Sequence, residues 1–191
     1  MTISFVPGGW ENAGLTYAYS WRFPALPLFR QEADCIANSR ISRDPDRFDY
    51  MGLLAPGWYG EGAAVAVRCG FEKLGAPMLL LSMEDETDEN GALRTLEYYE
   101  IVIWKYGLNV WRHHTQNRDT SHYLVLGASF SLAEDEVHAL SAQVQEKHLL
   151  IEVDGREFRL YLHDLRAPFR LGYTACEGIC RLYGMTVTSP A

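Results

Sequence analysis

The sequence predicts an all-β fold, a two-sheet antiparallel β-sandwich. Helical periodicity is nearly absent, and short runs of alternating apolar and polar residues recur along the chain with turn residues between them. These runs predict roughly ten to thirteen short strands. One flat sheet of that many strands would have long exposed edges, and two packed sheets avoid this. The length of 191 residues suggests one domain, residues 1–191.

The first half of the chain contains irregular segments between its predicted strands. Residues 1–14 hold a Pro-Gly-Gly motif and are expected to be an irregular lead-in. Leu15–Phe23 is a predicted strand with Tyr17, Tyr19 and Trp21 on one face, ended by two nearby prolines. Glu32–Arg43 is expected to form one or two strands, and Arg43–Arg47 is expected to form a polar turn.

The segment Phe48–Gly62 is predicted to be a loop that displays aromatic side chains. Trp58 and Tyr59 lie there among three glycines and a proline. Loops that display aromatic rings often line binding sites, so both residues are candidate substrate contacts. Packing of the same rings onto a sheet edge is the alternative.

The remaining strands follow from alternation, apolar runs and turn signals. Pro77–Met83 is almost continuously apolar, as in a strand covered on both faces. Asp154-Gly155 is a strong hairpin signal and should pair Ile151 with Phe158 and Leu149 with Leu160. Ser131–Glu134 fits a capping box, which predicts one helical turn over Leu132–Glu136. The other expected strands are Ala63–Phe71, His122–Phe130, Val137–Gln145, His148–Val153, Glu157–Leu162, Phe169–Thr174 and Ile179–Val187.

The central stretch Leu96–His114 is predicted to be a hairpin with one core face and one polar-aromatic face. Successive side chains of a strand point to opposite sides. Tyr99, Ile101, Ile103 and Val110 therefore share the core face. The opposite face holds Tyr98, Glu100, Val102, Trp104, Asn109, Trp111 and His113.

The turn length decides how these residues pair. We expect an even loop, either the dipeptide Tyr106-Gly107 or a four-residue loop centred on it, because it keeps both faces consistent. This loop places Trp104 opposite Asn109 and Glu100 opposite His113. An odd loop would mix the two faces.

Charge and cysteine content exclude several function classes. Acidic residues outnumber basic ones 25 to 17, which argues against binding nucleic acid or an anionic membrane surface. The N-terminus lacks a signal-peptide pattern, and no apolar run approaches the roughly 20 residues of a membrane span, so a cytoplasmic location is expected. The four cysteines have no zinc-ligand spacing and are expected to be buried free thiols: Cys35, Cys69, Cys176 and Cys180.

The C-terminal strands resemble those of concanavalin A-like lectin/glucanase sandwiches. The resemblance rests on the Val153-Asp154-Gly155 hairpin, the Leu171-Gly172 strand and the closing strand Arg181–Val187. The arrangement is similar to that of small bacterial proteins of this superfamily found among sugar-utilisation genes. The resemblance implies a jelly-roll sandwich with two curved sheets, and a concave face on which relatives bind saccharides.

The polar-aromatic face supplies the chemistry that saccharide binding needs. Aromatic rings stack on the apolar faces of sugar rings, and carboxylate, amide and imidazole groups bond to hydroxyls. The candidate substrate-binding residues are Tyr98, Trp104, Asn109, Trp111, Trp58 and Tyr59. Glu100 and His113 are candidate catalytic residues, since imidazole titrates near neutrality. The alternative is that a loop or another chain covers this face.

The acidic segment Glu84–Gly91 is interpreted as a solvated hairpin loop. Its carboxylates look similar to the catalytic acids of superfamily glucanases, but they lead into Asn90-Gly91 instead of alternating with apolar strand residues. Calcium binding by these carboxylates is a lesser alternative. His113 and His114 cannot chelate one ion, because neighbouring strand residues point apart. No metal and no cofactor is expected.

Three functions therefore remain open. The first is a carbohydrate-binding or carbohydrate-processing protein that uses the concave face, with a saccharide or glycoside as its ligand. The second is a non-catalytic protein-interaction or oligomerisation module, so a homo-oligomer is possible. The third is a glycosidase or polysaccharide lyase with Glu100 and His113 as acid/base, although Glu100 has no second carboxylate on its own strand face. Glu177 lies in a predicted turn from which it could reach a sheet rim.

Overall fold

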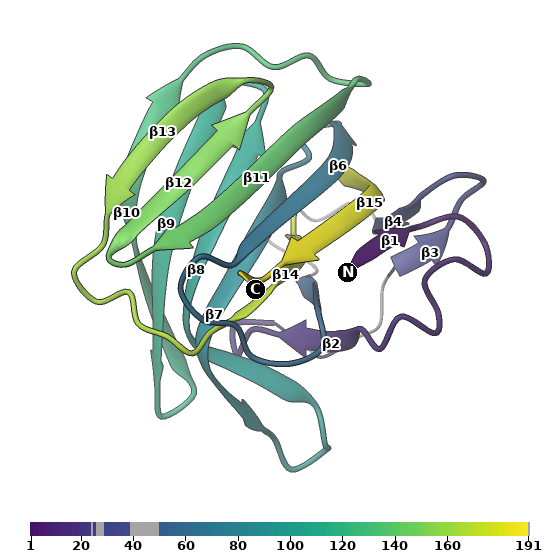
Figure 1. Cartoon of the computed structure of the whole chain (residues 1–191). Helices are drawn as coiled ribbons and strands as arrows, with labels where there is room; N and C mark the ends of the chain where they lie inside the picture. Colours follow the sequence, from purple (N-terminus) through teal and green to yellow (C-terminus); the bar gives the residue numbers. More distant parts are fainter. Residues whose placement is uncertain (24, 26–28, 39–49, 191) are drawn as a thin grey trace.

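The computed structural model describes residues 1–23, 25, 29–38 and 50–190, which form two sheets packed face to face (Figure 1). Fifteen strands and no helix occur in these ranges, so the predicted all-β sandwich is confirmed. The predicted turn Arg43–Arg47 and the second part of the segment Glu32–Arg43 lie outside the described residues. No helix of the described chain is long and apolar enough to cross a membrane.

The eight-stranded sheet has the order β13-β12-β11-β6-β15-β4-β3, with β1 paired to β15. Ile151 pairs with Phe158 and Leu149 with Leu160 in its β12–β13 hairpin, as the Asp-Gly turn predicts. The strands are β1 (Thr2–Ser4), β3 (Phe29–Gln31), β4 (Ile36–Asn38), β6 (Ala64–Glu72), β11 (Val137–Gln145), β12 (His148–Val153), β13 (Arg156–Tyr161) and β15 (Ile179–Thr188).

The seven-stranded sheet has the order β10-β9-β8-β2-β5-β14-β7, with a further pairing between β8 and β7. The β7–β8 hairpin protrudes beyond the two sheets (Figure 1). The strands are β2 (Thr16–Tyr19), β5 (Met51–Leu54), β7 (Pro77–Thr87), β8 (Leu93–Trp104), β9 (Gly107–Gln116), β10 (Asp119–Ser129) and β14 (Arg170–Ala175).

Five predicted elements need correction. Thr2–Ser4, in the predicted irregular lead-in, and Met51–Leu54, in the predicted loop Phe48–Gly62, are the strands β1 and β5. The predicted strand Leu15–Phe23 ends at Tyr19, so Trp21 lies in a turn. The strand β7 continues to Thr87, so only the second part of the predicted acidic loop is a turn. The helical turn over Leu132–Glu136 is wrong. The amide of Leu132 donates instead to the carbonyl of Lys105, which holds this segment against the β8–β9 turn.

The main core lies between the sheets and uses the residues that alternation assigned to it. Tyr99, Ile101, Ile103 and Val110 are all buried there, together with side chains from the facing sheet such as Val65. Their neighbours along the strands point to the opposite side of the seven-stranded sheet. We call this side the outer face.

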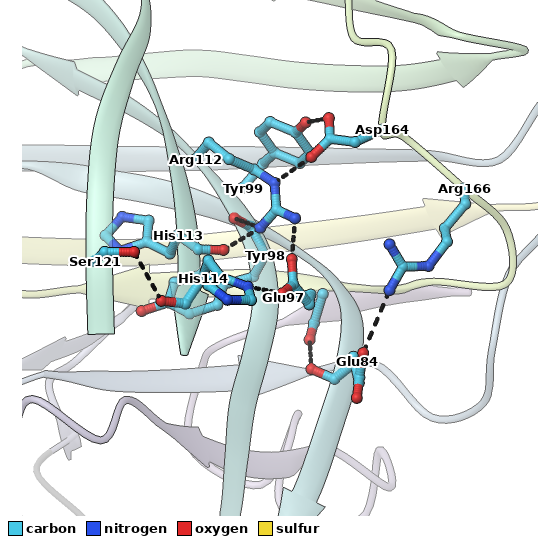
Figure 2. A network of polar contacts seen from close by, with 11 residues as sticks. Glu84, Glu97, Tyr98, Tyr99, Arg112, His113, His114, Ser121, Asp164 and Arg166 are labelled. Atoms are coloured by element: carbon cyan, nitrogen blue, oxygen red, sulfur yellow. Dashed lines mark hydrogen bonds and ion pairs between the residues drawn. The ribbon is translucent and has the colours of Figure 1, made fainter. Parts of the chain in front are cut away.

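A buried ionic network ties the β13–β14 connection to the seven-stranded sheet (Figure 2). Arg112 contacts the carboxylates of Glu97 and Asp164, with Nε 2.6 Å from Oδ2 of Asp164. The hydroxyl of Tyr99 donates to the same Asp164 carboxylate. The network supports β8 and β9 from the core side, opposite to the outer face.

The seven-stranded sheet curls over its own outer face. The strand β2 pairs with β5 and also, in parallel, with the beginning of β8, through Ala18–Leu93 and Tyr19–Arg94. Together with the pairings of β8 to β7, β7 to β14 and β14 to β5, this closes a circuit of strands. A small buried cluster fills the enclosed space: Ala18, Leu54, Leu80 and Tyr98. The outer face is therefore concave at this end.

Candidate functional site

The β8–β9 hairpin has the predicted even parity but a different register. The loop is Lys105-Tyr106, so Trp104 pairs with Gly107 and Glu100 pairs with Trp111. The predicted pairs Trp104–Asn109 and Glu100–His113 are therefore wrong by two residues. A shift of two keeps every side chain on its predicted face, because strands have a period of two.

Gly107 explains the change in register. It belongs to β9, where it pairs with Trp104 on one side and with Ser129 of β10 on the other. Its φ is +135°, and a Cβ at this position would collide with the carbonyl of Ala128. Gly107 is thus required by close packing of β10 rather than by the turn itself.

A pocket of about 310 Å³ lies on the outer face beside this hairpin. Its floor includes an apolar cluster of Ala76, Met78 and Val102, against which Trp104 and Trp111 pack. Both tryptophans are half-buried, so part of each remains accessible. The lining residues are Arg22, Phe23, Leu74, Ala76, Met78, Glu100, Val102, Trp104, Asn109, Trp111, His113, His122, Cys176 and Glu177.

Glu100 and His113 form a buried polar pair in the pocket. Oε2 of Glu100 lies 2.8 Å from Nε2 of His113, and the side chains are 8% and 4% exposed. Oε1 of Glu100 and both ring nitrogens of His113 make no hydrogen bond of good geometry among the described residues, so the Nε2–Oε2 approach is a close contact and not a well-aligned hydrogen bond. Buried polar groups normally have partners, so these atoms leave hydrogen-bonding capacity unsatisfied at the base of the pocket.

Aromatic rings on both sides orient the His113 imidazole. The ring of Tyr98 stacks on it with centroids 4.5 Å apart and an interplanar angle of 7°. The ring of His122 from β10 lies 5.5 Å away at 16°. Partial burial and the neighbouring charges of Arg22 and His113 lower the pKa of His122, and Glu100 opposes them. The neutral form of His122 is therefore favoured beside the pair.

Glu177 brings a second carboxylate to the pocket, which sequence analysis of the hairpin alone had missed. It lies between β14 and β15, far from Glu100 in the sequence, and only its position in a predicted turn signalled it. Partial burial and the charge of Glu100 raise the pKa of Glu177. The pocket thus contains two carboxylates in different environments.

Three candidate substrate-binding residues do not line this pocket. Tyr98 has no exposed surface, and its hydroxyl donates to Oγ of Ser20, 3.2 Å away. Trp58 is exposed but lies under the guanidinium of Arg170, with 5.0 Å from its ring centroid to Cζ. Tyr59 bridges to Phe169 and packs against the main core. The other candidates, Glu100, Trp104, Asn109, Trp111 and His113, are brought together.

The acidic hairpin does not contribute to the pocket, because its carboxylates pair with arginines. Each of Glu84, Asp85, Asp88 and Glu89 faces a different arginine, and Glu86 accepts from the Trp21 indole. The described residues contain no group of three or more side chains suited to hold a metal ion. The four cysteines are free thiols: Cys35, Cys69 and Cys180 are buried, and Cys176 lines the pocket half-buried.

No protein-family model matches the sequence, and no curated protein matches it significantly. Solved structures do match in three dimensions. The β-agarase A of Zobellia galactanivorans superposes with a TM-score of 0.67 at 9% identity, covering 100% of this chain and 88% of the agarase. The β-glucanase of Bacillus licheniformis gives 0.63 at 13% identity, covering 100% and 98%.

A carbohydrate-binding module also has a similar structure. The carbohydrate-binding module CBM66 of Bacillus subtilis superposes with a TM-score of 0.56 at 9% identity, covering 91% of this chain and 96% of the module. At these identities the similarity establishes the fold. The chain has the concanavalin A-like jelly-roll sandwich fold that the C-terminal strands suggested.

Proposed function

We propose that this protein binds a saccharide in the outer-face pocket. Trp111 and Trp104 provide the rings on which sugar faces stack, and Glu100, His113 and Asn109 bond to hydroxyls. Tyr98 is a positioning residue, because it contacts His113 and not the pocket. Trp58 and Tyr59 have no role in this proposal.

The observation that carries the proposal is the pair of unpartnered atoms in the pocket. Oε1 of Glu100 and Nδ1 of His113 are buried without a partner in the described structure, beside two half-buried indoles. A ligand that presents hydroxyls next to apolar ring faces satisfies both features at once. The comparison proteins support this class of ligand, since their names describe an agarase, a glucanase and a carbohydrate-binding module.

Calorimetric titration tests the proposal. The ligands are oligosaccharides of two to six units derived from agarose and from β-1,3- and β-1,4-glucans, followed by digests of other plant and algal polysaccharides. We expect at least one to bind, and Trp111→Ala to weaken it about 10- to 100-fold, or roughly 1.4–2.8 kcal/mol. Trp58→Ala is the matched control and should leave the affinity unchanged.

The outcomes separate the proposal from its alternatives. Equal losses in the two tryptophan variants would place the ligand outside the pocket. Absence of binding across the whole set, with self-association that depends on concentration, would favour the protein-interaction module instead.

Glycoside hydrolysis is a second candidate function, favoured by the position of Glu177. Hydrolases usually need two carboxyl groups roughly 5–10 Å apart, and one of them acts as an acid with a raised pKa. Glu100 and Glu177 line the same pocket, and the pKa of Glu177 is raised by partial burial and by the charge of Glu100. Glu177 is then the candidate acid and Glu100 the nucleophile or base, with His113 as its proton partner.

Turnover of the bound saccharide tests this second function. A hydrolase should lose at least about 100-fold in turnover in both variants, since Glu177→Gln removes the acid and Glu100→Gln removes the nucleophile or base. A polysaccharide lyase that uses Glu100 and His113 would retain turnover in Glu177→Gln and form an unsaturated product detectable by ultraviolet absorbance. A bound saccharide that stays intact with the wild-type protein limits the function to binding.

A further inference from the structure

The outer-face pocket is closed at one end, and the closure is part of the fold. No residue of β2, β5 or β14 lines the pocket, although these strands belong to the same sheet. The pairing of β2 with β8 and the buried cluster around Tyr98 occupy the outer face at this end. A saccharide lying across the sheet cannot continue in this direction.

The segment Ser20–Phe23, which follows β2, forms a wall at the closed end. The guanidinium of Arg94 donates to the carbonyls of Ser20 and Phe23, over 2.9 and 3.1 Å, and pairs with Asp88 at 2.9 Å. Arg94 is only 7% exposed, so these bonds are shielded from water. They fix the wall to the start of β8, and Phe23 lines the pocket from it.

Tyr50 completes the wall beside the catalytic candidates. Its ring stacks on Phe23 with centroids 5.9 Å apart and an interplanar angle of 9°, and Tyr50 is 3% exposed. Its hydroxyl lies beside Thr174 of β14 and Glu100 of β8. The stack of Phe23 on Tyr50 thus reaches Thr174 of β14 and Glu100 of β8.

We infer that the pocket binds the end of a saccharide chain and not an internal segment of it. This inference rests on the proposed function. Glu100 on β8 lies beside Tyr50 of this wall, and His113 on β9 and then His122 on the edge strand β10 follow in order away from it. The chain enters over the β9–β10 side, and its terminal unit contacts the Glu100–His113 pair. The pocket volume of about 310 Å³ is near the lower limit of about 300–1,000 Å³ for small-ligand sites, which suits a chain end better than a long internal segment.

Competition between long and short chains of one saccharide tests the inference. The probes are agarose and linear β-1,3- and β-1,4-glucans, each before and after partial endo-cleavage, compared at equal total sugar. If the pocket recognises chain ends, the dissociation constant expressed as total sugar concentration should fall about tenfold when the chain length is reduced tenfold. The reason is that the number of chain ends at a given total sugar rises tenfold. Affinity per sugar unit that does not change with chain length would overturn the inference and leave the proposed function intact.

Two further results complete the test. Phe23→Ala removes a ring of the wall and should reduce the preference for cut over uncut chains. Tyr161 is an exposed residue of the edge strand β13, so Tyr161→Ala is the control and should preserve this preference. An unchanged preference in a folded Phe23→Ala protein would contradict the assigned wall. Failure of all saccharides overturns both proposals.

Discussion

Nε2 of His113 lies 2.8 Å from Oε2 of Glu100, and both side chains are buried on adjacent strands of the seven-stranded sheet. The pair does not follow from direct cross-strand opposition, since Glu100 faces Trp111 and His113 faces Tyr98. It is a diagonal contact, held by the stacked ring of Tyr98. Oε1 of Glu100 and both ring nitrogens of His113 make no hydrogen bond of good geometry within the described structure.

Glu100→Gln should weaken saccharide binding and moderately destabilise the protein. The carboxylate is a stronger acceptor for a hydroxyl than the amide, so we expect a loss of about tenfold or more. Glutamine preserves the volume but loses the charge that faces His113, so we expect a loss of about 1–3 kcal/mol in unfolding free energy. Calorimetric titration and denaturant unfolding measure the two effects. Undiminished affinity would exclude the Glu100 carboxylate from the binding site.

Glu177→Gln should slightly stabilise the protein at neutral pH. Partial burial and the charge of Glu100 raise the pKa of Glu177, so the folded protein binds more protons than the unfolded chain between the two pKa values. Stability therefore falls as the pH rises through this interval and stays lower above it. We expect the variant to gain a few tenths of a kcal/mol, about the scale of exposed charges.

The gain in Glu177→Gln should disappear below the unfolded pKa of about 4.3, where both states are protonated. Urea unfolding at pH 3.5 and pH 7 measures this difference. A variant that is less stable than wild type at pH 7 would show that the ionised Glu177 is favourably paired, contrary to the present account.

Asp164→Asn should destabilise the sandwich through the network that it shares with Arg112 and Tyr99. Burial acts to raise the pKa of Asp164, but hydrogen bonds from Tyr99 and Arg112 outweigh it and lower the pKa. Breaking a buried pair costs about 3–5 kcal/mol, and Asp164 is 24% exposed, so we expect about 2 kcal/mol. Chemical unfolding measures it, with Glu89→Gln in the exposed pair with Arg118 as the control.

The stabilisation that Asp164 contributes should be lost in acid, because its pKa is lowered in the folded protein. It is fully present above the unfolded pKa of about 3.9 and is lost as the pH falls through the lower folded pKa. The wild type and Asp164→Asn should therefore converge in stability in strong acid. A constant difference between them from pH 7 to pH 2 would assign the loss to packing instead of charge.

Gly107→Ala should disrupt the hairpin that carries the pocket. Its φ of +135° and the neighbouring carbonyl of Ala128 leave no place for a Cβ. We expect a loss of about 2–4 kcal/mol in unfolding free energy and weaker saccharide binding, because Trp111 follows on the same strand. Gly60→Ala is the control, since a Cβ there meets nothing within 4 Å. Wild-type stability in Gly107→Ala would contradict the close packing of β10.

The sequence was sufficient to predict the faces of the central hairpin but not its register. Alternation assigned Ile101 and Val110 to the core and Glu100 and Trp111 to the opposite side, and both assignments are correct. The position of the turn depended on Gly107, which sequence analysis took as a turn residue. The actual reason for this glycine is its contact with β10, a neighbour that local pattern does not reveal.

The boundaries of the pocket could not be predicted for a similar reason. Phe23, Tyr50 and Glu177 reach the site from three connections that are distant in the sequence. Tyr98 was expected at the surface of the site because it alternates with Glu100. The parallel pairing of β2 with β8 buries it instead, and such long-range pairings leave no short sequence signal. Trp58, a conspicuous loop aromatic, stacks with Arg170 outside the pocket.

The indole resonances of the five tryptophans test the central claim most directly, because each reports from a different place. Trp10 and Trp21 donate to Gln31 and Glu86, and Trp58 stacks with Arg170, all outside the pocket. In a nuclear magnetic resonance titration of tryptophan-labelled protein with a saccharide that binds, we predict that the Nε1–H signals of Trp111 and Trp104 shift and the other three stay. Stationary signals for Trp111 and Trp104, with the largest shift at Trp58, would contradict the assignment of the site.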